Sequence, residues 1–372
     1  MNQPKTPLAY ACAACNTMMR KYRAEDLPPK GHFHYHQGVF LSGMYKTYLQ
    51  CNDERYFSYI KAWVDCVVDS DGNIPSVNPG WLDDIQPGIL LFPLLERTDD
   101  IRYKKALDTL LPYVLNTPRN RVGGFWHKDV FPNQMWLDGL YMAGPICAEY
   151  AQRFHRTEYL NLVTEQIILM ETNLRDEKSG LWYHAWDESR QALWADSNTG
   201  LSAEFWGRSV GWVPVALLDD MDFMDTQDSR YSEIGDIAVR LLQAVLRYQT
   251  PEGRWCQVID KAHKAENWPE NSCSCLFVAA ISKAVRIGLL DKSYLLAAQK
   301  GYDAVIASLN WQNDDLMIGN VCIGTDVGDF KHYCERPVST NDLHGVGAFL
   351  LMCEELEQAL QTTRNQSTTV LP

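Results

Sequence analysis

Residues 138–144 read Asp138-Gly-Leu-Tyr-Met-Ala-Gly144, a segment that is small and apolar on every side after its first residue. A helix that is apolar all round is a buried helix. Each glycine costs an isolated helix about 1 kcal/mol relative to alanine, so close packing between helices explains why they are tolerated. Five further segments share this character, and they begin at His36, Ile85, Trp206, Cys273 and His344. The sequence therefore predicts six buried helices.

Stretches of a second kind alternate with these segments, and only one face of each is apolar. Between residues 103 and 114, for example, Tyr103, Leu107, Leu110, Leu111 and Val114 fall on one helical face. Similar stretches occur near residues 5–23, 55–69, 157–173, 234–248 and 292–309. Six alternating pairs close into a double ring. We therefore predict an all-α fold, an (α/α)6 barrel with an inner ring of buried helices and an outer amphipathic ring.

The connections between helices repeat as well. Three outer stretches are followed by a Gly-x-Trp turn, which begins at Gly124, Gly180 and Gly253. Each turn leads into a polar, aromatic-rich loop and then into a buried segment. No linker or change of composition divides the chain, so we predict a single domain over residues 1–360. Residues 361–372 are polar, and we expect them to form a frayed C-terminal tail.

Composition narrows the classes of function. The chain has 372 residues, of which 46% are hydrophobic, so it can bury a core and is not disordered. Its formal net charge of −13 disfavours binding to nucleic acid or to an anionic membrane surface. A small anionic substrate is compatible with this charge, because a pocket can carry local positive groups. No segment approaches the run of about 20 apolar residues that a membrane span needs.

Other features indicate an unexported protein without a metal or cofactor. The first residues show no signal-peptide pattern, and the eleven cysteines are odd in number and irregularly spaced, which predicts a cytoplasmic protein with reduced thiols. Cys12-x-x-Cys15 is interpreted as packing. His32-x-His34-x-His36 lacks a further ligand at metal spacing. The acidic run from Asp219 to Asp228 lacks the pattern of a calcium loop and is interpreted as a solvated connection. There is no phosphate-binding motif.

A double ring places the starts of all inner helices at one end, around a central cavity. Asp138 stands at such a start, and Asp83 and Asp84 stand at the matching position of the preceding repeat. Asp138 is interpreted either as a helix N-cap or as one of two carboxylates that share acid–base work. Tryptophan faces beside carboxylates suit a sugar substrate.

Further polar and aromatic residues fall at the same end. Arg208 lies between Trp206 and Trp212, where it serves either as a structural ion-pair partner or as a ligand for a substrate carboxylate or hydroxyls. His184 lies in the loop before this helix, and Trp136 lies just before Asp138. A lone loop histidine is often structural, but its place in the repeat puts His184 at the cavity mouth.

Several phrases of the sequence resemble the unsaturated rhamnogalacturonyl hydrolases, which are family 105 glycoside hydrolases. The resemblance runs in order from about residue 8 to residue 358. The phrases are Tyr35-His-Gln-Gly-Val-Phe, Leu82-Asp-Asp-Ile-Gln-Pro-Gly, Gly124-Phe-Trp-His-Lys-Asp, Gln134-Met-Trp-Leu-Asp-Gly-Leu-Tyr-Met, Tyr183-His-Ala-Trp-Asp and Glu204-Phe-Trp-Gly-Arg-Ser-Val-Gly-Trp. It implies the same barrel, and cytoplasmic breakdown of pectin fragments in a bacterium.

The resemblance also implies a chemistry. The substrate is a 4,5-unsaturated uronic acid at the non-reducing end of an oligosaccharide, and a carboxylic acid protonates C4 while water adds at C5. It implies that Asp138 is this acid and base and that Asp83 is the second carboxylate, with Asp84 as the alternative. Its substrate-contacting positions match Tyr35, His36, His184, Trp206, Arg208 and Trp212. Lys128 and Arg336 lie in loops that could meet the uronate carboxylate.

The acid role predicts a raised pKa for Asp138, through burial and the charge of its partner carboxylate. Alternatives stay open. A conventional inverting glycosidase would hold two carboxyl groups about 6.5–9.5 Å apart. An unsaturated glucuronyl hydrolase, a sugar epimerase using His184 and His344, and a non-catalytic sugar-binding protein are the others. The sequence supports no choice of oligomeric state or of the sugar that follows the uronate.

Overall fold

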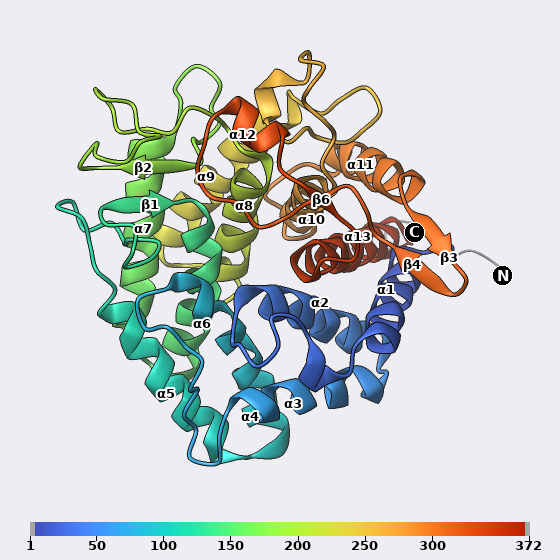
Figure 1. Ribbon diagram of the computed structural model, residues 1–372. Helices are drawn as coiled ribbons and strands as arrows, with labels where there is room; N and C mark the ends of the chain where they lie inside the picture. The colour runs from blue at the N-terminus through green and yellow to red at the C-terminus, as the bar shows by residue number, and fades with distance from the viewer. Residues whose placement is uncertain (1–3, 369–372) are drawn as a thin grey trace.

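The computed structural model describes residues 4–368 and shows two concentric rings of helices (Figure 1). The outer ring consists of α1 (Pro7–Lys21), α3 (Glu54–Val67), α5 (Ile101–Leu115), α7 (Thr157–Leu174), α9 (Ser229–Leu246) and α11 (Leu295–Ala307). The inner ring contains α2 (Tyr35–Cys51), α6 (Asp138–Phe154), α8 (Gly207–Met221), α10 (Asn271–Arg286) and α13 (Leu343–Thr368). Its remaining position is filled by two 3₁₀ turns, Leu82–Asp84 and Gln86–Leu90, followed by α4 (Leu91–Thr98). The predicted (α/α)6 barrel is confirmed.

The ring closes because its last inner helix packs against its first. α13 lies between α10 and α2, and the other inner elements follow in the order of the chain. The second inner element is not one continuous helix, because two 3₁₀ turns precede α4, and Pro87 lies in the first turn of the second one. The inner helices are buried on nearly every side. All fifteen residues of α8, for instance, are buried.

One end of the barrel has very short connections. α2 ends at Asn52 in the left-handed conformation, and Asp53 then caps α3 by accepting from the Arg55 N–H. α4 and α5 are joined in the same way, through Asp99 and the cap Asp100. A left-handed residue followed by an acidic N-cap reverses the chain within two residues. The long loops therefore lie at the opposite end of the barrel.

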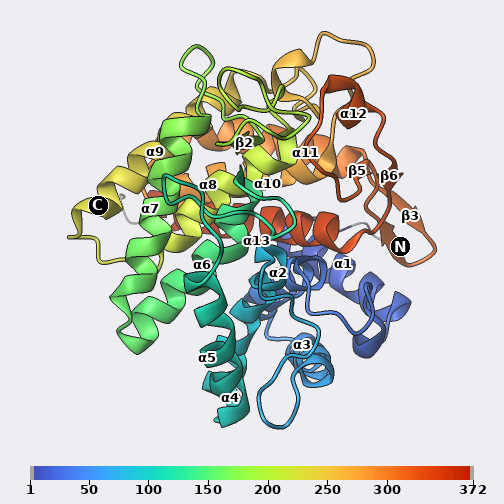
Figure 2. The same cartoon turned by 60° about the vertical axis from the view of Figure 1, so that its left-hand side comes forward.

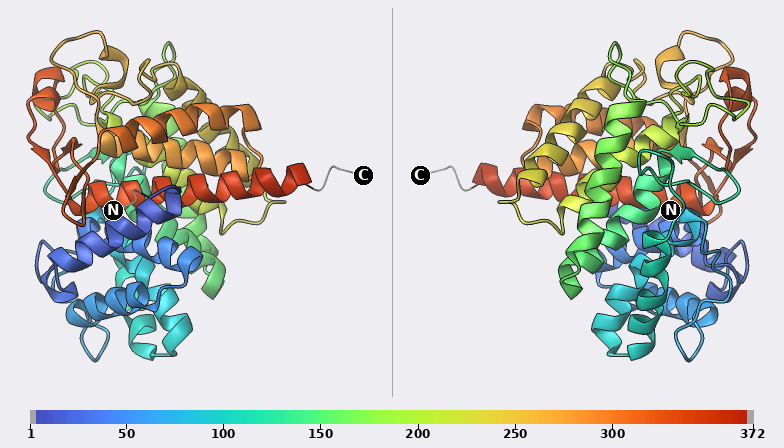
Figure 3. Two further views of the ribbon diagram at one scale, coloured as in Figure 1. Left: turned by 90° about the vertical axis from the view of Figure 1, so that its right-hand side faces the viewer. Right: turned by 90° about the vertical axis from the view of Figure 1, so that its left-hand side faces the viewer.

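The long loops gather at the other end (Figures 2 and 3). They carry three small antiparallel pairs, β1 (Gln134–Trp136) with β2 (Ala185–Asp187), β3 (Asn310–Gln312) with β4 (Asp315–Met317), and β5 (Val321–Cys322) with β6 (Val338–Ser339). The short helix α12 (Phe330–Cys334) lies between β5 and β6. These loops enter the N-terminal ends of the inner helices. The candidate residues of the site are therefore brought together at this end.

The acidic run 219–228 differs from its prediction as a solvated connection. Asp219 and Asp220 are the last buried acidic residues of α8. Lys283 of α10, itself 3% exposed, places its Nζ 2.6 Å from Asp219 Oδ1 and 2.5 Å from Asp222 Oδ2. A cation from the neighbouring inner helix thus pairs with Asp219 and Asp222, whereas burial raises the pKa of Asp220, so the beginning of the run is structural.

The polar segment at the C-terminal end also differs from its prediction. α13 continues through Thr368, so residues 361–368 are helical rather than frayed, and residues 369–372 lie outside the described part. Among residues 4–368, no helix is both long enough and apolar enough to cross a membrane.

Candidate active site

A cavity of about 220 Å³ opens at the end of the barrel where the long loops gather. Asp83 and Asp138 both line it, although they are far apart in the sequence. Five other predicted residues line it too, namely Tyr35, His36, Trp136, Trp206 and Arg208. The starts of the inner helices thus converge on one space.

Asp138 is the first residue of α6, and its side chain does not cap that helix. The N-cap position is Leu137, which makes no side-chain hydrogen bond. Asp138 Oδ2 instead lies 3.3 Å from Nε2 of His184, and the Asp138 side chain is only 14% exposed. The interpretation of Asp138 as a helix cap is therefore wrong, and its carboxylate faces a histidine at the cavity.

The expectation of a raised pKa for Asp138 is not met in the unliganded protein. Burial raises this pKa, but the His184 imidazole that faces the carboxylate outweighs it, and His127 and Arg208 also favour the ionised form. The pKa of Asp138 therefore lies below its ordinary value. The sequence indicates burial and a second carboxylate beside Asp138, but it does not indicate the basic groups that the fold gathers around this residue.

The second carboxylate, Asp83, carries a compensated charge. Its Oδ2 lies 2.8 Å from Nζ of Lys128, and its Oδ1 lies 3.3 Å from Nε2 of His127. His34 approaches the same carboxylate at 4.0 Å. Burial raises the pKa of Asp83, but these neighbours hold it well below its ordinary value. Asp83 is thus an ionised group that holds a lysine and a histidine at the cavity wall.

Three predicted contact residues lie outside the cavity lining, namely His184, Asp84 and Trp212. His184 is fully buried and contacts Asp138 instead of lying at the cavity mouth. Asp84 Oδ2 accepts a hydrogen bond from the Asn78 N–H at 2.9 Å, and burial raises the pKa of Asp84 to about 7. Trp212 is 1% exposed and stacks on Tyr141, with 4.5 Å between ring centroids. Of the two neighbouring aspartates, Asp83 is therefore the one that the fold turns toward the cavity.

Arg208 makes no carboxylate ion pair within 4 Å among the described residues. Its Nη1 donates to the carbonyl of Cys322 at 2.5 Å, and its Nη2 donates to the carbonyl of Ile323 at 2.8 Å. Its guanidinium also lies 4.6 Å from the ring centroid of Trp206. Arg208 therefore joins α8 to the segment after β5, and it places a fixed positive charge at the cavity.

One wall of the cavity is a stack of rings. Trp136 lies between His127, at 4.7 Å and 12° between planes, and Phe131, at 5.0 Å and 17°. Lys128 covers the Trp81 ring at 4.5 Å. Both faces of Trp136 are therefore covered by protein rings, and its role in sugar binding stays a prediction.

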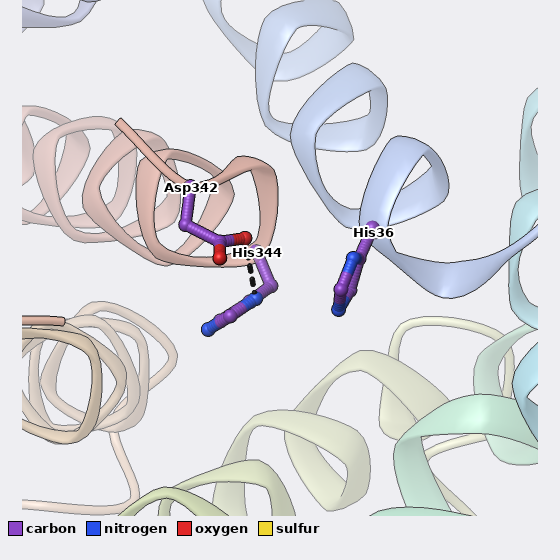
Figure 4. A group of neighbouring side chains, drawn as sticks. All are labelled: His36, Asp342 and His344. Atoms are coloured by element: carbon purple, nitrogen blue, oxygen red, sulfur yellow. Dashed lines mark ion pairs between the residues drawn. The ribbon is translucent and has the colours of Figure 1, made fainter. Parts of the chain in front are cut away.

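His36, Asp342 and His344 form a cluster beside the cavity (Figure 4). One possible ligand atom from each lies within 4.8 Å of the others, a donor set that suits a divalent transition metal. These atoms already have protein partners, however. His344 Nδ1 lies 2.8 Å from Asp342 Oδ1, its Nε2 lies 3.0 Å from the Cys322 carbonyl, and His36 Nε2 lies 2.9 Å from Tyr35 Oη. The contacts are those of a hydrogen-bonded network.

This network bears on two expectations from the sequence. Of the three histidines at alternate positions 32, 34 and 36, only His36 belongs to it. His344, which the epimerase alternative requires, is turned toward Asp342 and Cys322 and is not among the residues that line the cavity. The structure thus does not present His184 and His344 as a pair at the cavity.

The sequence argument missed several residues of the site. His127 directly follows the Gly124-Phe-Trp turn, and His184 follows the Gly180-Leu-Trp turn one residue later, so a histidine after a Gly-x-Trp turn is the signal that could have identified it. The sequence suggested that Lys128 and Arg336 could meet the substrate carboxylate. Lys128 lines the cavity beside Asp83, whereas Arg336 does not line it and donates to the Gly324 carbonyl at 2.5 Å. Residues 324–326 line the cavity from the connection between β5 and β6, which has no counterpart in the other repeats.

Comparisons with known proteins agree with this architecture. The chain is similar in fold and sequence to a family 105 glycoside hydrolase of C. acetobutylicum ATCC 824, with a TM-score of 0.89 and 32% identity over 94% of this chain and 99% of that one. An unsaturated glucuronyl hydrolase from Bacillus sp. GL1 shares the fold, with a TM-score of 0.71 and 12% identity over 97% of both chains.

Sequence similarity supports the same family assignment. The unsaturated rhamnogalacturonyl hydrolase YesR of Bacillus subtilis (strain 168) is 26% identical over 296 residues, which cover 78% of this chain and 79% of YesR. Glycosyl Hydrolase Family 88 matches residues 10–360, nearly the whole chain and every inner helix. The chain belongs to this family, together with the related family 105 proteins, and is a glycoside hydrolase.

Proposed function

We propose that this protein hydrates the C4=C5 double bond of a 4,5-unsaturated uronic acid at the non-reducing end of pectin-derived rhamnogalacturonan oligosaccharides. The observation that carries the proposal is the buried Asp138 carboxylate, held by His184 at a cavity that also contains Lys128 and Arg208. In a protein of net charge −13, these two cations give the cavity a local attraction for an anionic sugar.

The proposed reaction is proton transfer to carbon followed by addition of water. The Asp138 carboxyl group gives its proton to C4, and positive charge develops at C5 and the ring oxygen. The Asp138 carboxylate then takes a proton from water, whose oxygen bonds to C5. The resulting hemiketal opens as the C5–ring oxygen bond breaks, which leaves a ketone at C5 and a hemiacetal at C1. The hemiacetal releases the next sugar as an alcohol.

Substrate binding supplies the protonated acid that this scheme requires. C4 is two bonds away from the carbon of the uronate carboxylate, so a group that reaches C4 lies within a few ångströms of a second negative charge. A like charge at such a distance raises the pKa of a carboxyl group. Asp138 is therefore ionised in the free protein and takes up a proton as the anionic sugar binds.

Asp83 serves a different purpose in this scheme. Its negative charge is already compensated by Lys128 and His127, so it remains ionised throughout the reaction. We propose that it accepts hydrogen bonds from sugar hydroxyls and holds Lys128 and His127 at the cavity wall. Trp136 and Trp206, whose ring faces are held by neighbouring side chains, supply apolar lining for the sugar, and Tyr35, His36 and Arg208 supply further polar contacts.

The decisive experiment uses Asp138→Asn and a panel of lyase-generated disaccharides. The panel contains unsaturated galacturonyl and glucuronyl sugars joined to rhamnose or to other sugars. Hydration destroys the ultraviolet absorbance of the unsaturated uronate, so the rate is read directly. We expect Asp138→Asn to fold normally and to lose nearly all turnover. Asp303→Asn, which makes the same change on the exposed face of α11, is the matched control and should keep the wild-type rate.

Other outcomes separate the alternatives. Wild-type turnover by Asp138→Asn would remove Asp138 from the acid role. Cleavage of saturated glycosides would identify a conventional glycosidase instead. Binding of the unsaturated disaccharide without any product would identify a sugar-binding protein. Preference for the glucuronyl members of the panel would replace the galacturonyl assignment.

A further inference from the structure

Tyr333 of α12 lies behind the proposed acid and does not line the cavity. It is fully buried, and its ring stacks on Trp206 with 5.7 Å between centroids and 9° between planes. Its hydroxyl oxygen lies 2.7 Å from Nδ1 of His184. The other nitrogen of the same imidazole, Nε2, faces Asp138 Oδ2 at 3.3 Å. A continuous line of polar atoms thus runs from Tyr333 to Asp138.

An ionised Asp138 carboxylate can only accept, so it favours a hydrogen on Nε2 of His184 and leaves Nδ1 to accept from Tyr333. The Gly328 N–H donates to the Tyr333 hydroxyl oxygen at 3.0 Å, and a backbone N–H can only donate. The single hydroxyl hydrogen of Tyr333 is then free to point at His184 Nδ1. Burial lowers the pKa of His184, so its imidazole is neutral at neutral pH and carries one hydrogen. With Nδ1 accepting, that hydrogen resides on Nε2 and points at Asp138.

We propose that Tyr333 is a positioning residue that fixes the His184 tautomer and thereby the oxygen of Asp138 that carries the reacting proton. In this tautomer the Nε2–H of His184 is directed at Oδ2 of Asp138, which lies 3.3 Å from Nε2. The proton that Asp138 transfers is therefore confined to Oδ1, because Oδ2 is already an acceptor. This inference rests on the proposed acid role of Asp138.

The alternative tautomer shows why this matters. If His184 carried its hydrogen on Nδ1, the bare Nε2 would face Oδ2 and would attract the acidic proton of Asp138 into an O–H···N bond. A proton held there is turned away from the substrate carbon. Tyr333 excludes this state by occupying Nδ1 with its own hydrogen. The same logic orients the histidine of a catalytic triad, in which a misplaced tautomer costs about 10⁴-fold in kcat.

The segment that carries Tyr333 is firmly attached to the barrel. Gln257 Nε2 donates to the Tyr333 carbonyl at 3.0 Å, and Trp268 Nε1 donates to the Cys334 carbonyl at 3.2 Å. The side chain of Tyr333 is therefore held independently of its hydroxyl. Replacing Tyr333 by phenylalanine should remove two hydrogen bonds of its hydroxyl, those with the Gly328 N–H and with His184 Nδ1, and leave the stacking on Trp206 in place.

The test compares Tyr333→Phe with Tyr59→Phe in the full-length protein. Tyr59 also loses a buried hydrogen bond, from its hydroxyl to the Tyr22 carbonyl at 2.9 Å, but it lies on the outer helix α3. We expect Tyr333→Phe to lower kcat by roughly 10- to 100-fold, less than a triad loses because the bond is between neutral groups. KM should change little, since Tyr333 does not line the cavity.

Two further readouts separate positioning from loss of stability. ¹⁵N NMR of histidine-labelled protein should show Nε2-protonated His184 in the wild type and in Tyr59→Phe, and a mixture of tautomers in Tyr333→Phe. The high-pH limb of kcat should move to higher pH in Tyr333→Phe, because Asp138 loses a donor that favours its ionised form. The other groups around Asp138, namely His127, Arg208 and Tyr35, are unchanged in this variant.

The outcomes are distinct from those of the proposed function. An unchanged His184 tautomer, or wild-type kcat with an unshifted pH limb, in Tyr333→Phe would overturn the positioning role even if Asp138→Asn is inactive. Full activity of Asp138→Asn would overturn the proposed function instead. In that case the NMR measurement would still report whether Tyr333 fixes His184.

Discussion

At the scale of single residues, the charges around Asp138 set the pH range in which it can act. In the free protein His184, His127 and Arg208 hold the pKa of Asp138 below its ordinary value despite burial. The uronate carboxylate of a bound substrate acts in the opposite direction. The same side chain is thus a base in the empty cavity and becomes an acid when the cavity is filled.

This difference predicts two separate pH limits. The pH dependence of kcat/KM reports the free protein, and that of kcat reports the substrate complex. Because a carboxyl acid loses its proton as the pH rises through its pKa, both parameters fall at high pH. We expect kcat/KM to begin its fall at a lower pH than kcat, measured as initial rates of absorbance loss on the preferred disaccharide. Limits at the same pH would show that the substrate does not raise the pKa of Asp138.

The residues of the site were predictable to different degrees. Asp83 and Asp138 stand at matching positions of adjacent repeats, so the sequence alone could place them together. The sign of the Asp138 pKa shift could not be predicted, because it depends on the orientation of His184 and on basic groups from other loops. Tyr333 lies in the connection between β5 and β6, where no repeat pattern guides an expectation.

At the scale of helices, burial patterns explain why the architecture was predictable. Inner helices are apolar all round and outer helices on one face, and this difference is local in the sequence. Pairing of buried charges is not local. Asp219 and Lys283 are separated by 64 positions and meet only because α8 and α10 are neighbours in the ring. The acidic run 219–228 was therefore misinterpreted.

Lys283→Met should destabilise the fold without affecting the chemistry. It leaves the buried Asp219 carboxylate without its nearest cation, and breaking a buried ion pair typically costs about 3–5 kcal/mol. Urea unfolding measures this loss, and kcat of the remaining folded protein should stay at the wild-type value. Lys331→Met is the control, since the Lys331–Glu335 pair is 3.8 Å apart and mostly exposed, and should change stability by about 0–1 kcal/mol. Equal effects of the two variants would contradict a structural role for the buried pair.

At the scale of the whole molecule, two groups of carboxyl side chains limit the pH range over which the folded state is stable. The pKa values of Asp83, Asp219 and Asp342 are lowered by neighbouring basic groups despite burial, so their stabilising contributions are lost as the pH falls below their ordinary range. Burial raises the pKa of Asp84 and Glu149 to about 7 and that of Glu354 to about 8. These three bind protons in the folded state, and their contributions are lost as the pH rises through those values.

We therefore expect the melting temperature to be highest near about pH 6 and to fall on both sides. The buried His34 and His36, whose pKa values burial lowers to about 4 and about 3, add to the fall on the acidic side because they charge more readily when unfolded. Glu354→Gln removes one ionising group and should flatten the fall above neutral pH. Calorimetry across the pH range tests this, and an unchanged alkaline slope in Glu354→Gln would contradict it.

Ring closure by α13 has a consequence for synthesis. The helix that fills the space between α10 and α2 leaves the ribosome after every other inner helix, and the segment bearing Tyr333 emerges only shortly before it. Until then, the apolar surfaces of α2 and α10 that α13 covers in the folded protein are exposed to water. The nascent chain can therefore assemble hairpins but no closed barrel before α13 has emerged, and ring closure depends on protection of those surfaces until then.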